Sequence, residues 1–510
     1  MTSRRIWAVF ACVAVLAPGA AWGELAVTEE VLGPAHDRRM EPTTSADGLH
    51  YAYVTIDAEK NMAFVVHDGT EGPRLTRLHK PLLFSADGTR FAYGGGLPDG
   101  GQCYVIDGQV LGPYEAVAGR TLAFSPDGKR VIYAARSEGK SRVYVDGQPQ
   151  APYDRIHAPV VFSPDGKRYL YKGRRGDKWV LVVDGKETGE YDDTAKDHPV
   201  FSPDSKRVAC HACTGPWEGG DHFVLVDGVR GPSYEAIGTL SFSPDGKRLA
   251  YKAKRGGKWR AVIDGREGLE FDAIGNAGVV FSPDASRYAY LAMQGDQWLT
   301  VVDGEVVGSS YDSSAAGSPT FSPDSAHVVV HACRGEWENV KHLFTVDGEE
   351  QPEYDFVTSW RYSADARRFM YEARRGPKQG GKHHLVLDGR KGPAYDDIWG
   401  HVFSPDGRRT AYVGQKAEER YVVVDGVPGP AFDGARSPVF SPDSQHVAAA
   451  VSGGSLGPNK AAVMLDGELG PECDTIVQNG PSFVADDTVQ YLAIRAGNLV
   501  RITQRLTTPQ

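Results

Sequence analysis

The chain has 510 residues and a formal net charge of −10 at pH 7, with 41% hydrophobic and 24% charged residues. This length exceeds what one ordinary hydrophobic core supports, so we expect several domains or a repeat array. The acidic balance excludes a general attraction for nucleic acid or anionic membranes. The 60 glycines, 32 prolines and 23 tyrosines indicate many short strands joined by tight turns rather than a disordered chain.

The first 23 residues are predicted to be a cleavable export signal. Arg4 and Arg5 precede an apolar stretch over residues 6–17, and Ala21 to Gly23 offer small residues before an expected cleavage near Glu24. The apolar stretch is too short to cross a bilayer, which takes about 20 residues. We therefore expect a mature protein in the periplasm or outside the cell, with no transmembrane segment after the signal is removed.

A repeat of about forty residues fills the rest of the chain. Exact copies of the string Phe-Ser-Pro-Asp begin at Phe124, Phe162, Phe201, Phe242, Phe281, Phe321, Phe403 and Phe440, and degraded copies begin at Thr44, Phe84, Tyr362 and Phe483. A hydrophobic run ending in Asp-Gly and a Gly-Pro-x-Tyr-Asp-like element recur with the same period. Three motifs in register predict twelve copies of one structural unit.

One of these units shows how the repeat is expected to fold. Its strand-forming segments are residues 160–162, 168–171, 179–183 and 186–191. Pro164 and Gly166 suit the first turn, and Asp184 with Gly185 suits the last hairpin. Four antiparallel strands in about forty residues match a β-propeller blade. Helical solenoids are excluded because no segment has an apolar period of 3.6.

The string Phe-Ser-Pro-Asp-Gly-Lys-Arg, followed by a tyrosine-rich strand, resembles the WD-like propeller repeat of the TolB family. Similar repeats form the propeller domains of prolyl-oligopeptidase-type enzymes. The resemblance covers residues 40–490 and implies the fold of the blade, whereas it says little about activity. The Val-Asp-Gly and Gly-Pro-x-Tyr-Asp elements of this chain depart from the usual family pattern.

The way in which twelve blades close is predicted from the two ends of the chain. Residues 31–37 read as a fourth strand with no blade before it, and the last unit, which begins at Phe483, has three strands. The variant string Phe-Ser-Pro-Asp-Ser recurs every three blades, which favours two six-bladed propellers, residues 24–265 and 266–510. One twelve-bladed ring uses the same strands and is the alternative.

Two pairs of residues raise the question of a metal site. His211 and Cys213, and likewise His331 and Cys333, are spaced i and i+2 at matching places in two units. They share one face of a strand, so each pair could converge with a histidine of the next strand, His222 or His342, as a zinc or copper site. Buried core cysteines inherited by triplet duplication are the favoured interpretation, and the sequence leaves the question open.

The sequence predicts no catalytic residue and no cofactor. Residues 453–457 match the formula G-x-S-x-G, but they lie in a glycine-rich loop inside a blade and not at a strand-to-helix turn. No P-loop or dinucleotide fingerprint stands out. The many turn aspartates are single and follow the blade period, so turn geometry explains them better than calcium, which needs clustered oxygen ligands.

The loops between the second and third strands vary in length and composition, whereas the turns at the opposite end are uniform. Rigid scaffolds usually carry function on such variable loops. The candidate binding residues there are Arg174, Arg175, Trp217, Lys254, Arg255, Trp337, Arg374 and Arg375.

We therefore expect an exported, non-enzymatic scaffold that binds another protein or an envelope or extracellular ligand, and not nucleic acid. A propeller enzyme of the lyase, lactonase or glycosidase type with dispersed residues is the alternative. A purely structural envelope or surface component is a third hypothesis.

Overall fold

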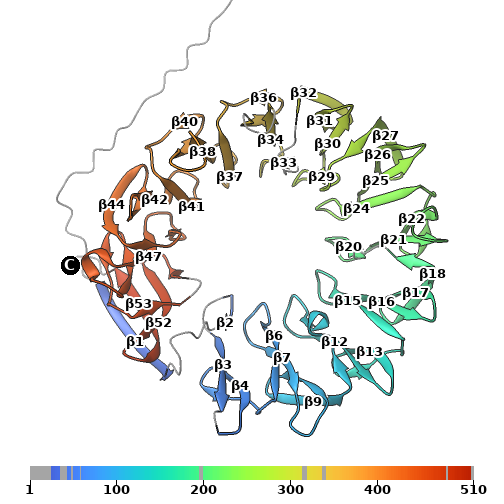
Figure 1. The fold of residues 1–510 in the computed structure, drawn as a ribbon, viewed down its shortest axis with the longest axis horizontal. Helices are drawn as coiled ribbons and strands as arrows, with labels where there is room; N and C mark the ends of the chain where they lie inside the picture. The colour runs from blue at the N-terminus through green and yellow to red at the C-terminus, as the bar shows by residue number, and fades with distance from the viewer. Residues whose placement is uncertain are drawn as a thin grey trace, which may run out of the picture.

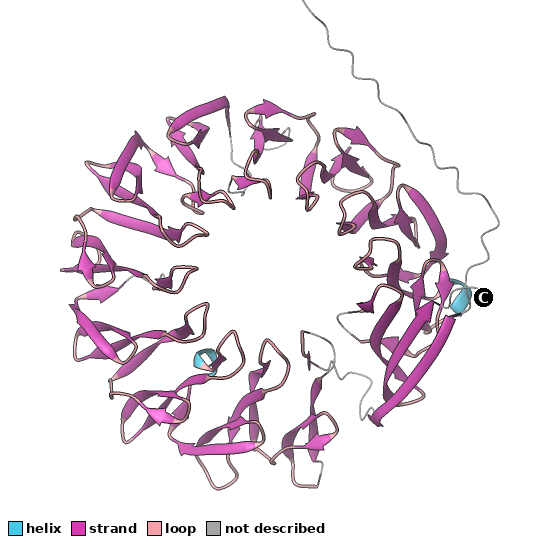
Figure 2. Cartoon of the chain, turned by 180° about the vertical axis from the view of Figure 1, so that it is seen from behind, coloured by secondary structure: helices cyan, strands magenta, loops and turns pink. Residues whose placement is uncertain are grey.

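The computed structural model describes residues 25–34, 43–46, 50–57, 59–194, 199–312, 319–335, 340–477 and 480–506. The predicted export signal lies outside these residues. The described residues form twelve antiparallel sheets of four or five strands, and Figures 1 and 2 show them as the blades of a single ring around an open centre. The all-β propeller with twelve blades is thus confirmed. In the described part of the chain, we find no helix with the length and hydrophobicity needed to cross a membrane.

The first six blades follow the chain. Their strands are β2 (Thr43–Thr44), β3 (Tyr51–Asp57), β4 (Met62–His67) and β5 (Thr70–Glu71) in blade 1; β6 (Arg77–Phe84), β7 (Phe91–Gly96), β8 (Gln102–Ile106) and β9 (Gln109–Tyr114) in blade 2; β10 (Ala116–Val117), β11 (Ala123–Phe124), β12 (Val131–Ser137), β13 (Lys140–Val145) and β14 (Gln148–Pro149) in blade 3; β15 (Arg155–Phe162), β16 (Tyr169–Arg175), β17 (Lys178–Val183) and β18 (Lys186–Tyr191) in blade 4; β19 (Asp193–Thr194), β20 (Val200–Phe201), β21 (Val208–Thr214), β22 (Asp221–Val226) and β23 (Val229–Arg230) in blade 5; and β24 (Ala236–Phe242), β25 (Leu249–Arg255), β26 (Lys258–Ile263) and β27 (Arg266–Phe271) in blade 6.

The last six blades continue the series, with one strand borrowed from the N-terminal end. Their strands are β28 (Ala273–Ile274), β29 (Val280–Phe281), β30 (Tyr288–Gln294), β31 (Gln297–Val302) and β32 (Glu305–Tyr311) in blade 7; β33 (Thr320–Phe321), β34 (Val328–Arg334), β35 (Lys341–Val346) and β36 (Glu349–Glu350) in blade 8; β37 (Phe356–Tyr362), β38 (Phe369–Arg375), β39 (Lys382–Leu387) and β40 (Arg390–Lys391) in blade 9; β41 (Asp397–Phe403), β42 (Thr410–Lys416), β43 (Glu419–Val424) and β44 (Val427–Phe432) in blade 10; β45 (Gly434–Ala435), β46 (Val439–Phe440), β47 (Val447–Ser452), β48 (Ala461–Leu465) and β49 (Glu468–Leu469) in blade 11; and β50 (Thr475–Ile476), β51 (Ser482–Ala485), β52 (Thr488–Arg495), β53 (Asn498–Leu506) and β1 (Leu25–Pro34) in blade 12. In the described residues, two short 3-10 helices, η1 (Gly119–Thr121) and η3 (Gly454–Leu456), lie in loops.

The hydrophobic core is divided among the spaces between neighbouring blades. In blade 4, Tyr171 packs against residues of blade 3, whereas Leu170 packs against Cys210 and Phe223 of blade 5. Successive side chains of a strand point to opposite faces of the sheet, so each blade buries both faces. This explains why the second and third strands of each unit are nearly continuous apolar runs instead of alternating ones.

The ring closes through the N-terminal strand. β1 pairs antiparallel with β53, from Leu25 opposite Leu506 to Pro34 opposite Asn498. Leu32 of β1 also packs in the cluster between blades 12 and 1, where its carbonyl oxygen accepts a 2.9 Å hydrogen bond from the hydroxyl of Tyr51. The expectation of two six-bladed rings is therefore wrong, and the blades form the alternative, one twelve-bladed ring.

The physical reason for this correction lies at the two ends of the chain. The last unit lacks a fourth strand, and β1 supplies the missing strand, so both ends of the chain meet in blade 12. Repeat spacing sets the number of blades, but the angle between neighbouring blades decides how many of them complete a circle. Residue 265, where we expected a boundary, lies in the turn between β26 and β27 of blade 6.

A repeated arginine contact joins neighbouring blades on the turn face, which carries the first-to-second and third-to-fourth turns. In blade 4, Arg168 pairs with Asp184 at 2.9 Å, donates to the backbone oxygen of Lys206 in blade 5 at 2.7 Å, and lies over the ring of Phe201. The same arginine position contacts the next blade at Arg90, Arg130, Arg168, Arg207, Arg248, Arg287, Arg368 and Arg409. The turn aspartates are thus structural, as the sequence indicated.

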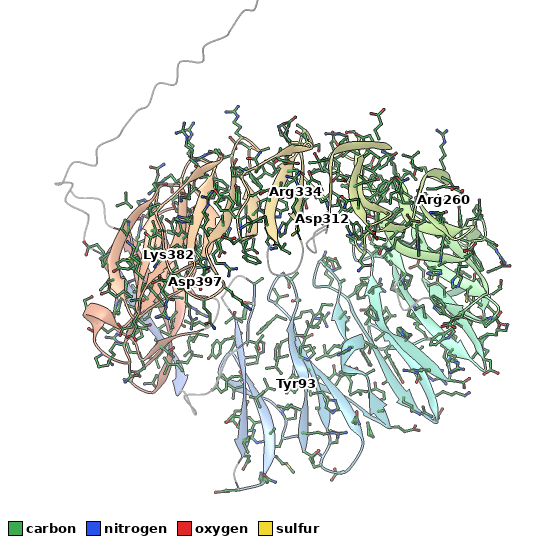
Figure 3. All side chains as sticks on the ribbon, turned by 45° about the horizontal axis from the view of Figure 1, so that its top comes forward. Tyr93, Arg260, Asp312, Arg334, Lys382 and Asp397 are labelled. Atoms are coloured by element: carbon green, nitrogen blue, oxygen red, sulfur yellow. The ribbon has the colours of Figure 1, made fainter. Side chains whose placement is uncertain are left out.

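A second repeated contact joins the blades on the opposite face, which we call the hairpin face because it carries the second-to-third-strand hairpins. Asp312, at the end of blade 7, accepts hydrogen bonds from the side-chain amide of Gln297 at 3.0 Å and from the backbone N–H of Gly335 in blade 8 at 2.8 Å. Figure 3 shows Asp312 beside Arg334, the neighbour of that glycine. Asp154, Asp192, Asp272, Asp355 and Asp396 bridge in the same way, with a lysine as first partner. Both faces of the ring are therefore cross-linked by polar contacts.

Candidate functional site

The second arginine of each predicted basic pair packs on a tyrosine of the preceding blade. Arg175 lies 5.4 Å from the ring of Tyr153 and pairs with Glu187 at 2.6 Å. Arg255 lies over Tyr234 and Arg375 lies over Tyr354, at 4.6 and 5.1 Å. A guanidinium over an aromatic face is a favourable cation–π contact. These three candidates therefore have a role between blades, whether or not they also meet a ligand.

The first basic residue of each pair points to the following blade. Arg174 and Lys254 lie directly opposite the tryptophans Trp179 and Trp259 of the adjacent strand. Arg374 occupies the same position in blade 9, where its guanidinium lies 5.3 Å from the ring of Phe356. The structure therefore gathers the arginine and lysine pairs at one face of the ring but divides each pair between two inter-blade spaces.

Trp217 is the exposed aromatic residue among the described candidates. Its side chain is 42% exposed, in the long hairpin between β21 and β22. One edge of the indole rests on His222, with ring centres 4.8 Å apart, and its backbone oxygen accepts a hydrogen bond from Nε2 of His222 at 2.9 Å. Trp337, the corresponding candidate of blade 8, lies outside the described residues.

Three of the candidates, Arg174, Lys254 and Arg374, belong to a larger pattern that the structure brings together. In six successive blades, the fourth and sixth residues of the second strand and the second residue of the third strand share the face toward the next blade. The trios are Lys172, Arg174 and Trp179; His211, Cys213 and His222; Lys252, Lys254 and Trp259; Leu291, Met293 and Trp298; His331, Cys333 and His342; and Glu372, Arg374 and His383. Five of these six trios, all except that of blade 7, thus place charged, histidine or cysteine side chains between neighbouring blades.

The long side chains of this pattern reach the neighbouring blade. Lys252 Nζ donates hydrogen bonds to the backbone oxygens of Ile274 and Gly275 in blade 7, both at 3.1 Å. Lys172, in the same position of blade 4, is 2% exposed. A buried ammonium group is costly unless it is hydrogen-bonded, so Lys252 links blades 6 and 7 instead of binding a ligand from solution.

The trio of blade 5 forms a hydrogen-bonded histidine pair. His211 Nε2 lies 2.9 Å from His222 Nδ1. Because His222 Nε2 must donate to the carbonyl oxygen of Trp217, its Nδ1 accepts from His211. Burial, with His222 close by, lowers the pKa of His211 to about 3. His211 is therefore neutral at neutral pH, and its Nδ1 is buried without a hydrogen-bond partner among the described residues.

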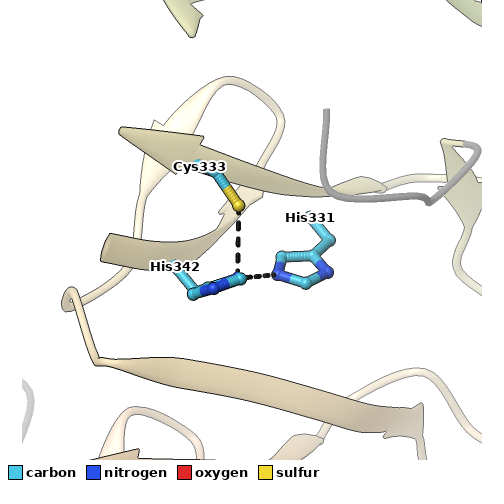
Figure 4. Close-up of side chains that lie close together, drawn as sticks. All are labelled: His331, Cys333 and His342. Atoms are coloured by element: carbon cyan, nitrogen blue, oxygen red, sulfur yellow. Dashed lines mark hydrogen bonds between the residues drawn. The ribbon is translucent and has the colours of Figure 1, made fainter. Parts of the chain in front are cut away.

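The trio of blade 8 has the same residue types in a different arrangement (Figure 4). His342 Nδ1 lies 3.1 Å from His331 Nε2 and 3.2 Å from Cys333 Sγ. Burial lowers the pKa of both histidines, that of His331 to about 4. Two imidazoles and one thiol thus converge in a partly buried space between blades 8 and 9.

Blade 9 contains an acid–base pair that the sequence reasoning missed. Glu372 Oε1 lies 2.7 Å from His383 Nδ1, and Asp397 of blade 10 lies 3.8 Å from the same nitrogen. Burial raises the pKa of Glu372. The signal was available, because Glu372 has the strand position of His211 and His331, and His383 has that of His222 and His342.

Solved β-propellers resemble this chain. The propeller domain of the trilobed protease from Pyrococcus furiosus is 13% identical, covers 54% of this chain and 94% of its own, and has a TM-score of 0.27. TolB from Acinetobacter baumannii is 17% identical, covers 52% and 77%, and has a TM-score of 0.23. The dihydro-heme d1 dehydrogenase NirN is 15% identical, covers 64% and 77%, and has a TM-score of 0.29. These likenesses concern the fold alone. No family model and no curated protein matches the chain in sequence.

Proposed function

We propose that this protein is an exported, non-enzymatic binding scaffold that holds another protein or an envelope ligand on the hairpin face of the ring. The observation that carries the proposal is the difference between the two faces. On the turn face, the recurring arginines and aspartates are engaged in contacts between blades, and the turns themselves are uniform. On the hairpin face, the loops differ from blade to blade.

Trp217 is the candidate anchor for such a ligand. It is a large, partly exposed aromatic side chain on a rigid hairpin, held in place by His222. Tryptophan is among the residues enriched in binding hot spots, and anchoring on a rigid scaffold lowers the entropy that is lost on binding. The hairpins of blades 2, 9 and 11 are also elongated, over residues 97–101, 376–381 and 453–460, so the face offers an uneven surface to a partner.

Site-specific photo-crosslinking in the exporting cell tests this proposal. A photoreactive amino acid replaces Trp217 on the hairpin face or, as the matched control, Lys247 on the turn face, whose side chain is 81% exposed. We expect a discrete crosslinked species from position 217 and none from position 247. Crosslinking to a partner from position 247 but not from position 217 would show that the binding surface is the turn face and would contradict the proposal.

Export is the second part of the proposal. The basic start, the apolar stretch and the small residues before Glu24 support it. The intact mass of protein isolated from the periplasm or the medium should correspond to a chain that begins near residue 24. Protein found in the cytoplasm with Arg4 and Arg5 retained would contradict this part of the proposal and leave the binding face untouched.

A further inference from the structure

Three potential metal ligands meet between blades 8 and 9. His331 and Cys333 come from β34 and His342 comes from the facing strand β35, where it lies directly opposite Cys333. Their ligand atoms, Nε2, Sγ and Nδ1, all lie within 4.8 Å of one another. Figure 4 shows the thiol and the second imidazole approaching the same ring of His342.

His342 Nδ1 is the atom that the other two ligand atoms approach. His342 Nδ1 has two polar neighbours, His331 Nε2 at 3.1 Å and Cys333 Sγ at 3.2 Å. A ring nitrogen carries either one proton or one in-plane lone pair. In either tautomer of His342, therefore, only one of the two neighbours is well satisfied by this nitrogen. A cation bound to all three atoms satisfies each of them at once.

The spacing of the atoms is close to that of the first coordination shell of zinc. With Zn–N bonds of about 2.0–2.1 Å and a Zn–S bond of about 2.3 Å, tetrahedral ligands lie about 3.3–3.6 Å apart. The two separations from His342 Nδ1 fall a few tenths of an ångström short of that range, and the third pair, His331 Nε2 and Cys333 Sγ, lies within 4.8 Å.

The chemistry of the donors limits the choice of metal. A thiolate with two neutral imidazoles suits Zn²⁺ or Cu⁺, and it disfavours Mg²⁺ and Ca²⁺, which take oxygen ligands. We propose that His331, Cys333 and His342 bind one thiophilic metal ion, Zn²⁺ or Cu⁺, between blades 8 and 9. Three protein ligands leave one coordination position for water or for a group of the bound partner.

Blade 5 provides a comparison within the same molecule. His211, Cys213 and His222 occupy the same strand positions, each 120 residues earlier. There the thiol of Cys213 lies 3.7 Å from the backbone oxygen of Gly215, and His222 is held by the backbone of Trp217. The thiol and histidine pair of blade 5 are thus engaged separately, whereas in blade 8 all three ligand atoms converge. We assign the metal to blade 8 alone.

Metal binding by the purified full-length chain tests the proposal. The protein is kept reduced and equilibrated with Zn²⁺ or, under anaerobic conditions, with Cu⁺. Unbound ion is then removed, and the metal that remains on the protein is measured by elemental mass spectrometry. We expect one equivalent of at least one of these ions. Co²⁺ loaded in place of Zn²⁺ should give the intense visible bands of a tetrahedral site and a sulfur-to-metal charge-transfer band.

Matched variants locate the ion. Cys333→Ser and His342→Gln should each lower retained metal at least tenfold and remove the charge-transfer band, whereas Cys213→Ser should leave both unchanged. Far-ultraviolet circular dichroism and the melting temperature of each metal-free variant identify a variant that has not folded, and His331→Gln then replaces it. A wild-type protein that retains no ion, or a Cys333→Ser protein with an unchanged cobalt spectrum, would overturn the assignment.

Discussion

The backbone N–H of Asp165 in blade 4 donates a 3.0 Å hydrogen bond to the hydroxyl oxygen of Ser205 in blade 5. Ser205 stands where half of the twelve repeats have glycine, and it keeps the positive φ of that position, 65°. The same contact recurs from Asp284 to Ser325 and from Asp406 to Ser444, three blades apart each time. The triplet pattern of the sequence therefore corresponds to a real difference in how the blades are joined.

Replacement of Ser205 separates the hydrogen bond from the backbone strain. Ser205→Ala removes the acceptor and keeps an unfavourable φ, so we expect it to lower the free energy of unfolding by about 1 kcal/mol. Ser205→Gly also removes the acceptor, but glycine adopts the positive φ without strain, so the loss in free energy of unfolding should be smaller. Denaturant unfolding of both variants measures this order. A glycine variant that is clearly less stable than the alanine variant would show that the strain argument is wrong.

Ala285 should be replaceable by glycine with a gain in stability. It occupies the same turn position in blade 7 with a φ of 64°. A left-handed conformation costs an ordinary residue about 1–2 kcal/mol, and glycine avoids this cost. Part of the gain is offset because glycine has a larger conformational entropy in the unfolded chain. We expect Ala285→Gly to raise the free energy of unfolding by about 0.5–1 kcal/mol. Ala289→Gly, in the buried strand β30, is the control and should be destabilising.

The arginine contact of the turn face should contribute measurably to stability. Arg168 joins Asp184, the backbone of Lys206 and the ring of Phe201, so Arg168→Ala should lower the free energy of unfolding by about 1–2 kcal/mol. Arg168→Lys keeps the charge but not the fork of donors, and it should recover less than half of the loss. Lys167→Ala, whose side chain is 83% exposed, is the control and should change little. Equal effects of Arg168→Ala and Lys167→Ala would contradict this role.

A disulfide across the closing strand tests the single ring. Thr28 of β1 lies opposite Thr503 of β53, and directly opposed residues have Cα atoms about 4.5–5.5 Å apart, within the span of a disulfide. Thr28→Cys with Thr503→Cys should form this link on mild oxidation, detected as a crosslinked peptide by mass spectrometry. The control pairs Thr28→Cys with Ile263→Cys in blade 6, the position equivalent to Thr503, as closure into two rings would require. Efficient linkage of the control pair would contradict the single ring.

The bridging aspartates of the hairpin face should make the ring acid-sensitive. Lys178 and the N–H of Gly215 hold the pKa of Asp192 below its usual value of 3.8. The unfolded state then binds the proton more readily, so this contribution to stability is present above about pH 4 and is lost as the pH falls through the folded-state pKa. We expect the melting temperature to fall steeply below about pH 4.

Two asparagine variants isolate the contribution of Asp192. Asp192→Asn should be less stable than the wild type at pH 7 and should show a shallower decline in acid. Asp177→Asn, in which a fully exposed carboxylate is replaced, should follow the wild-type curve. A steeper acid decline in Asp192→Asn than in the wild type would reverse the sign of the argument.

The sequence by itself determined the blade. The spacing of Phe-Ser-Pro-Asp and Asp-Gly turns fixes short antiparallel strands, because turn residues and apolar runs act through local geometry. It also placed His331 and Cys333 on one face of a strand, since residues two apart in a strand point the same way, and it offered His342 of the next strand as a candidate third ligand. The recurrence of arginine pairs was visible as well.

Only the tertiary structure decided the closure, the partners of the arginines and the difference between the two histidine–cysteine trios. Twelve blades close as one ring because each turns by half the angle that a six-bladed ring needs, and that angle depends on the packing between blades. Arg175 meets Tyr153 of another blade, a contact that no local pattern specifies. The thiol of Cys333 meets His342 while that of Cys213 turns to a backbone oxygen, because side-chain rotation responds to the surrounding packing and not to position along the strand.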